Sequence, residues 1–454
     1  MRLFARADMA AEGRHSLFRQ LGNGIAGLAG LMLVALYPFS ANATEIQEVT
    51  TPAGINAWLV EDHTVPIVAI DFAFQGGSAQ DPEGKEGLVN LLSRSLDEGA
   101  GDLDSQAFQA RMEDLVMQLS FDEGRDAFYG SMRTLTPNAT DAFEMLRLAV
   151  TEPRFDDEAI NRMKTQTISG LRQDLKDPDA IAARRWSELA FPGHPYGRPS
   201  KGTEETVSKL APADLKMMHE RLFARGNLKV AVVGDIDAAT LIPLLDKVFG
   251  ALPAAPDLTP VPEVEPKSGI VEAVAFNVPQ TSIRFGLPAL KRSDPDFIPA
   301  FVMNHILGGG SFSSWLYEEV REKRGLAYSV GSYLVPFDHA GLLMGATGTR
   351  AEKAGETLKI IDEQLTRMAS DGPSEEELAK AKSYLTGSYA LRFDTSGKIA
   401  NQLVGLQLEG FGPDYIENRN ATIEAVTLDQ VKAVAKRILD GKKPTVVTVG
   451  PKGA

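Results

Sequence analysis

The feature that most limits the fold of this 454-residue chain is a pattern that occurs twice, about 215 residues apart. In each copy an Asp-Pro pair precedes a helix, an Asp lies at the start of a later helix, and a buried strand ends at a glycine. The matched positions are Asp81-Pro82 with Asp294-Pro295, Asp214 with Asp429, and Gly234 with Gly450. The offsets are 213, 215 and 216 residues, in the same order along the chain. An internal duplication of this kind predicts two domains of the same architecture.

Apolar periodicity predicts strands and helices in both copies. The expected strands are 46–50, 55–60, 67–74, 117–121, 127–134, 228–233, 282–287 and 445–449, and the main expected helices of the first copy are 85–96, 105–115, 156–186 and 212–223. Hairpins between neighbouring strands indicate largely antiparallel sheets, which helices cover. We therefore expect the α+β class, with two homologous α/β domains.

A proline-rich segment separates the two copies. Five prolines lie between Pro253 and Pro266, and the segment has no helical period. Such segments stay extended and act as semi-rigid spacers. We predict an N-terminal domain at 44–252, a linker at 253–268 and a C-terminal domain at 269–454.

The first 43 residues are typical of a secretory signal peptide. Four arginines precede an uncharged, mostly apolar run, Gly24–Tyr37, and Ala41-Asn42-Ala43 is a suitable cleavage site. The alternative is a membrane anchor, but this run of 14 residues is shorter than the ~20 residues that a spanning helix needs. We therefore predict a periplasmic chain, cleaved near Ala43, with no stable membrane span after cleavage.

Composition excludes several classes of function. The chain has no cysteine, so disulfides, thiol catalysis and cysteine-ligated metals are excluded. The net charge of -14 argues against nucleic-acid binding, which needs a basic surface.

The stretch Asn304–Ser332 carries the most specific pattern. Three glycines follow an apolar helix, a short helix is expected from about Ser313 to Lys323, and Gly325 ends it before a strand. Arg321 lies in the last helical turn and Tyr328 follows seven residues later. With Leu-Tyr-x-x-x-Arg at 316–321 and Gly-Leu-Ala-Tyr at 325–328, the stretch closely resembles the C-terminal half of the pitrilysin/insulinase family of zinc peptidases. The resemblance extends over residues 44–454. It implies a processing-peptidase-like fold in which Arg321 and Tyr328 bind substrate and stabilise the reacting carbonyl.

The same resemblance implies a zinc motif, HxxEH, in the N-terminal half, and here the motif is degenerate. The matching segment is Gly87–Gly101, with Asn90 and Arg94 at the histidine positions and Ser93 at the glutamate position. The third ligand position, a downstream glutamate in the family, falls at about Gly170. The six histidines of the chain form no HxxH, HxxxH or HExxH pair. We therefore expect no metal in this chain and place the zinc in a partner subunit.

Two of these features also have ordinary structural interpretations. Arg321 could be one more exposed charge on a polar helix, and Tyr328 a half-buried aromatic of a strand; the family context favours the functional interpretation. Gly308, Gly309 and Gly310 could end a helix and act as a hinge. By resemblance to the alpha subunit of the mitochondrial processing peptidase, they could instead help to bind substrate. A phosphate-binding loop is excluded, because no Gly-Lys-Ser/Thr follows.

We therefore predict a non-catalytic subunit of a heterodimeric zinc metallopeptidase, inactive as an isolated chain. A paralogous partner would carry HxxEH and hydrolyse peptides, while this chain would supply Arg321 and Tyr328. The alternative is a purely structural or interaction protein of the same family with no role in peptide hydrolysis.

Overall fold

The first sheet of the computed structural model, which describes residues 45–452, has six strands in the order β1-β2-β8-β3-β7-β6. The strands are β1 (Gln47–Thr50), β2 (Asn56–Glu61), β3 (Ile67–Gln75), β6 (Gln118–Glu123), β7 (Ala127–Leu135) and β8 (Leu228–Gly234). Every neighbouring pair is antiparallel except β2 with β8. A separate two-stranded ribbon joins β4 (Gly99–Ala100) to β5 (Leu103–Asp104).

The second sheet has five strands in the order β11-β12-β10-β13-β9. These are β9 (Val271–Ala275), β10 (Gln280–Pro288), β11 (Ala327–Phe337), β12 (Ala340–Arg350) and β13 (Thr445–Gly450). Again one pair alone is parallel, β13 with β9. In each sheet the last strand of the copy pairs in parallel with an early strand, as the duplication predicts. The expected α+β class with antiparallel-dominated sheets is confirmed.

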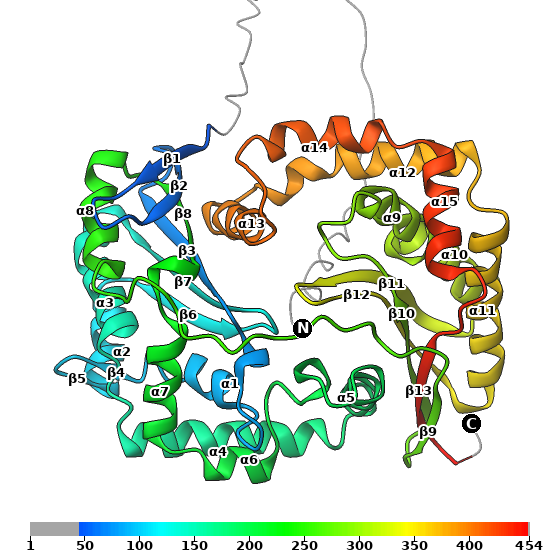
Figure 1. Ribbon diagram of the computed structural model, residues 1–454, viewed down its shortest axis with the longest axis horizontal. Helices are drawn as coiled ribbons and strands as arrows, with labels where there is room; N and C mark the ends of the chain where they lie inside the picture. Colours follow the sequence, from blue (N-terminus) through cyan, green and yellow to red (C-terminus); the bar gives the residue numbers. More distant parts are fainter. Residues whose placement is uncertain (1–44, 453–454) are drawn as a thin grey trace, which may run out of the picture. The chain divides into compact units, whose positions relative to one another are not determined.

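Helices surround both sheets (Figure 1). In the first copy they are α1 (Leu88–Ser93), α2 (Ser105–Asp114), α3 (Ala139–Thr151), α4 (Asp157–Asp174), α5 (Pro178–Ala190), α6 (Glu204–Lys209), α7 (Pro212–Leu222) and α8 (Ala238–Phe249). In the second they are α9 (Phe297–Asn304), α10 (Trp315–Tyr317), α11 (Ala354–Ser370), α12 (Glu375–Gly387), α13 (Ser396–Leu408), α14 (Tyr415–Glu424) and α15 (Leu428–Leu439). The single long helix expected at 156–186 is two helices. The Asp177 side chain accepts the Asp179 N–H as an N-cap, and Pro178 begins α5.

The cores of the two copies repeat one packing detail. Phe72 of β3 lies opposite Gly130 of β7, and Phe285 of β10 lies opposite Gly345 of β12. A Cβ atom on either glycine would overlap the facing phenyl ring. Each glycine therefore leaves the space that the ring fills, and the two pairs are 213 and 215 residues apart along the chain.

Two helices pack on the sheet of the other copy. Helix α5 contacts β10 and β13, and α13 contacts β3 and β8, as Figure 1 also shows. Trp186 of α5 is buried against Gly286, and its indole N–H donates to the Thr445 carbonyl of β13 at 2.9 Å. On the other sheet, Leu403 of α13 lies in one apolar cluster with Trp58 of β2. The exchange of helices joins the two sheets into one compact unit from Thr44 onward.

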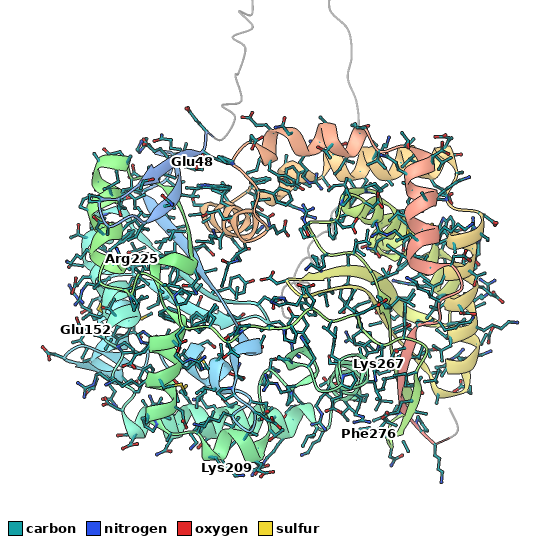
Figure 2. All side chains as sticks on the ribbon, in the orientation of Figure 1. Glu48, Glu152, Lys209, Arg225, Lys267 and Phe276 are labelled. Atoms are coloured by element: carbon teal, nitrogen blue, oxygen red, sulfur yellow. The ribbon has the colours of Figure 1, made fainter. Side chains whose placement is uncertain are left out.

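Residues 250–270, between α8 and β9, form neither helix nor strand. Arg225, labelled in Figure 2, holds one end: its backbone N–H donates to Pro253 O, and its guanidinium donates to Leu252 O. At the other end the Lys267 N–H donates to Ala190 O at the end of α5 (Figure 2). The segment is therefore fixed at both ends. The division into domains at 44–252 and 269–454 stays a prediction.

The predicted signal peptide, residues 1–43, lies outside the described residues. Within residues 45–452, no helix combines the length and the apolar character needed to cross a membrane.

Candidate functional site

Arg321 and Tyr328 lie against each other. The guanidinium carbon of Arg321 is 4.6 Å from the centre of the Tyr328 ring. Tyr317 and Phe312 complete a partial aromatic cage, at 4.8 and 5.9 Å from the same carbon. Cation–π attraction holds the guanidinium over the rings, which fixes its orientation without a carboxylate partner. The only nearby acid is Glu322, at 4.0 Å.

Two local irregularities bring this pair together. The expected helix at 313–323 is a short α-helix, α10, followed by a π-helical turn, η7 (Glu318–Glu322). Gly325, at φ 59°, ends it, and its N–H donates to Arg321 O. The pairing of β11 with β12 then shifts between Ala327 and Val330. This bulge contains Tyr328, whose ring is 82% exposed. π-turns and bulges are local devices that redirect side chains.

The arrangement presents hydrogen-bond donors to solvent on one surface. The guanidinium and the phenol can both donate to an oxygen that gains negative charge. The sequence analysis identified this pair but missed Phe312 and Tyr317. Tyr317 precedes Arg321 by four residues on a helix, a spacing that places two side chains on one face and could have revealed it.

Trp315, where the family often has arginine, is buried beneath the site. Its indole N–H donates to Glu377 Oε1 at 2.6 Å, and the Arg367 guanidinium lies 3.8 Å above its ring. These contacts tie α10 to α11 and α12. Trp315 therefore packs the helix that carries Arg321.

The three glycines have steric reasons of their own. They lie in or just after a π-helical turn, η5 (His305–Gly309), which packs on β11. A Cβ on Gly308 would lie 2.7 Å from the Ser332 nitrogen, one on Gly309 2.8 Å from Asn304 Nδ2, and one on Gly310 2.7 Å from His305 O. The glycines thus permit close contact between the turn and the strand. Their predicted role in substrate binding remains a prediction.

The degenerate zinc positions do not form a metal site. Asn90 and Ser93 are buried in α1, and the Ser93 hydroxyl donates to Asn90 O. Arg94 follows the helix and is exposed, and Gly170 lies on α4 with open space where a side chain would be. An amide, a committed hydroxyl, a guanidinium and a missing side chain do not fit Zn²⁺, which takes thiolate, imidazole or carboxylate ligands. Residues 45–452 hold no group of three or more His, Asp or Glu side chains placed to bind a metal.

Buried carboxylates surround α1 instead. Asp81 accepts the N–H groups of Gly87 and Val89 at the start of the helix, at 2.8 and 2.9 Å. Burial raises the pKa of Asp81 to about 7, although these hydrogen bonds and Arg198 act against the shift. Burial also raises the pKa of Glu123, and the Asn90 amide partly offsets that effect. Asp81 thus fixes α1, and Asn90 serves the polar surroundings of Glu123.

Known proteins share this sequence. The profile of the "Peptidase M16 inactive domain" matches residues 209–385. An uncharacterized zinc protease of Streptomyces coelicolor is 32% identical over 282 residues, which are 61% of each chain. An uncharacterized zinc protease of Mycobacterium tuberculosis is 31% identical over 306 residues, 66% of this chain and 68% of that protein. The non-peptidase homolog YmxG of Helicobacter pylori is 26% identical over 415 residues, 90% of this chain and 94% of that protein.

Solved structures share the fold. The crystal structure of a peptidase M16 inactive domain from Pseudomonas fluorescens has a TM-score of 0.85 at 29% identity, covering 90% of this chain and 98% of that one. The periplasmic protease PqqL from Escherichia coli has a TM-score of 0.77 at 18% identity, covering 90% of this chain and 46% of that one. At that identity the second likeness concerns the fold alone.

Proposed function

The chain belongs to the peptidase M16 family, and from this premise we propose that it is the non-catalytic subunit of a two-chain zinc metallopeptidase. Its matched segment is the family's inactive domain, and a full-length relative is named a non-peptidase homolog. The predicted resemblance to the pitrilysin/insulinase zinc peptidases is confirmed at the level of the family.

The observation that carries the proposal is the contrast between two sites. The positions of the zinc motif hold Asn90, Ser93 and Arg94, which do not fit a metal, whereas Arg321 and Tyr328 remain paired and accessible. A partner subunit with HxxEH would hold the zinc, which activates water for attack on a peptide bond. In this chain Arg321 and Tyr328 would donate hydrogen bonds to the peptide oxygen as it gains charge.

The substrates would be peptides or unfolded segments. The exposed aromatic side chains around Arg321 suit an extended chain better than a folded surface, because Phe312 and Tyr328 project singly from short turns. A periplasmic location rests on the predicted signal peptide at 1–43, and the likeness to a periplasmic protease is consistent with it.

The test begins with co-purification. The tagged mature chain is isolated from its native cells, and retained proteins are identified by mass spectrometry. We expect a similar-sized protein that carries HxxEH. Recovery of the chain alone, or with unrelated envelope proteins only, would favour the alternative of a structural protein without a role in hydrolysis.

The second step measures peptide cleavage by the assembled complex. Arg321→Ala and Tyr328→Phe are each expected to lower kcat by about 10- to 1,000-fold, the range for losing one donor to a developing oxyanion. The matched control is Arg172→Ala, an arginine on α4 whose ion-pair partner is Glu204; its kcat should stay unchanged. Full activity of both site variants in an intact complex would refute the proposed role.

A further inference from the structure

One arginine lies buried on the central strand of the second sheet. Arg284 is in the middle of β10, between Ile283 and Phe285, which face the apolar core of this sheet. Because side chains alternate along a strand, Arg284 faces the opposite side with Ser282 and Gly286. Helix α5 covers that side over Gly286, where Trp186 lies.

The guanidinium of Arg284 has a fixed position and no counter-ion. The residue is only 6% exposed, and Nη1 donates to the Tyr333 hydroxyl at 3.0 Å. Among residues 45–452, no Asp or Glu oxygen lies within 4.0 Å of it. The nearby acid Asp179 instead accepts the hydroxyl of Ser282. A buried charge without a partner is costly, so such an arginine is typically retained for a ligand.

Three donors at this position remain available. Nε and Nη2 of Arg284 donate to no group among the described residues, yet neither is sealed from solvent. The Tyr333 hydroxyl accepts from Arg284 and keeps its own proton for another acceptor, and its ring is 41% exposed. Two parallel N–H groups of an arginine match the two oxygens of a carboxylate.

The sheet beside Arg284 is open enough to admit a ligand. Ala346 lies directly opposite Arg284 on β12, and Gly331 of β11 pairs with Ala346. Gly348, opposite Ser282, is exposed, and a Cβ there would meet nothing within 4 Å. This floor of small residues continues along β11 toward Tyr328, which precedes Tyr333 by five residues.

We propose that Arg284 and Tyr333 form a binding site for a carboxylate of the peptide substrate. The identification of the ligand as a substrate peptide rests on the proposed function. The carboxylate comes either from the C-terminus of the peptide or from an acidic side chain, and both would meet the same three donors.

The test measures binding by the purified mature chain alone, with three fluorescent decapeptides of one apolar sequence. The first has a free C-terminus, the second a C-terminal amide, and the third an amide and one central Glu. Tighter binding of the first than the second, by about 10-fold or more, indicates the terminal carboxylate; recovery of affinity by the third indicates a side chain.

Arg284→Met should abolish this preference while the melting temperature stays unchanged or rises, because an unpaired buried charge is removed. A merely structural arginine would instead lower it. If Arg284→Met does not fold, Tyr333→Phe removes one hydroxyl and should weaken the carboxylate preference about 3- to 10-fold. Arg172→Met is the matched control and should keep the preference.

Equal binding of all three peptides, no binding of any, or a preference that survives Arg284→Met would overturn the inference. These outcomes are separable from the proposed function. Failure to find an HxxEH partner leaves the binding measurement intact, whereas a lost carboxylate preference leaves the roles of Arg321 and Tyr328 in the complex unchanged.

Discussion

The exchange of helices between the two copies makes Trp186 a test of how stability is distributed. Trp186 belongs to the first copy in sequence but fills space over Gly286 and donates to Thr445 O in the second sheet. Truncation to alanine removes a fully buried indole, which costs about 3–5 kcal/mol, and leaves a buried carbonyl without its donor. We take about 4 kcal/mol for the whole change. Unfolding roughly 400 residues has an entropy of about 0.8 kcal/mol per kelvin, so Trp186→Ala should lower Tm by about 5 °C.

Scanning calorimetry of the purified mature chain measures this shift. We expect one transition that moves as a whole, because the exchanged helices make the two sheets depend on each other. Trp186→Phe, which keeps an aromatic ring but loses the indole N–H, should shift Tm by less than half as much. The control is Phe312→Ala, an aromatic that is 70% exposed, with a shift near zero. A shift below about 1 °C for Trp186→Ala, or two transitions of which only one moves, would refute the reasoning.

Two further predictions concern buried groups of the first sheet. Burial raises the pKa of Asp71 from 3.8 to about 6, although the Asn401 amide acts against the shift; the folded state therefore favours the neutral acid, and stability is lost as pH rises from about 4 to 6. Asp71→Asn should raise the free energy of unfolding by at most about 3 kcal/mol at pH 7.5 and by progressively less toward pH 4, and melting curves across this range would contradict us if the gain did not depend on pH. Gly130→Ala should cost about 1–3 kcal/mol, because the new methyl group overlaps the Phe72 ring, whereas Gly348→Ala in open space should change little. Urea denaturation of both variants measures this, and equal midpoints would show that Phe72 can move aside.

Much of the fold could be predicted from the sequence because its strands are short apolar runs bounded by turns. The hairpin expected at 117–134 is β6 with β7, and the buried run at 228–233 is β8 near the middle of its sheet. The parallel pairing of β2 with β8 and the exchange of α5 and α13 could not be predicted. They depend on contacts between residues far apart in the chain, such as Trp186 and Thr445, which no local periodicity records.

The candidate site was predictable in its residues and not in its geometry. Arg321 and Tyr328 could be identified because two short patterns flank them. The π-turn at Glu318–Glu322 and the bulge at 327–330 are set by packing, and they decide that the two side chains meet. Arg284 escaped notice because a single arginine within an apolar strand has no spacing to reveal it. Its character appears only when the absence of a carboxylate partner within the described residues is seen.

The contact between α5 and β13 also sets a condition on biosynthesis. Trp186 and its acceptor Thr445 are 259 residues apart, and β13 is the last strand of the chain. A ribosome adds about 5–20 residues each second, so the acceptor strand emerges on the order of ten to fifty seconds after the helix. During that interval the apolar face of α5 has no sheet to cover it. A nascent chain that ends before residue 445 would keep this face exposed, which marks it for chaperones and proteases however well its first sheet has formed.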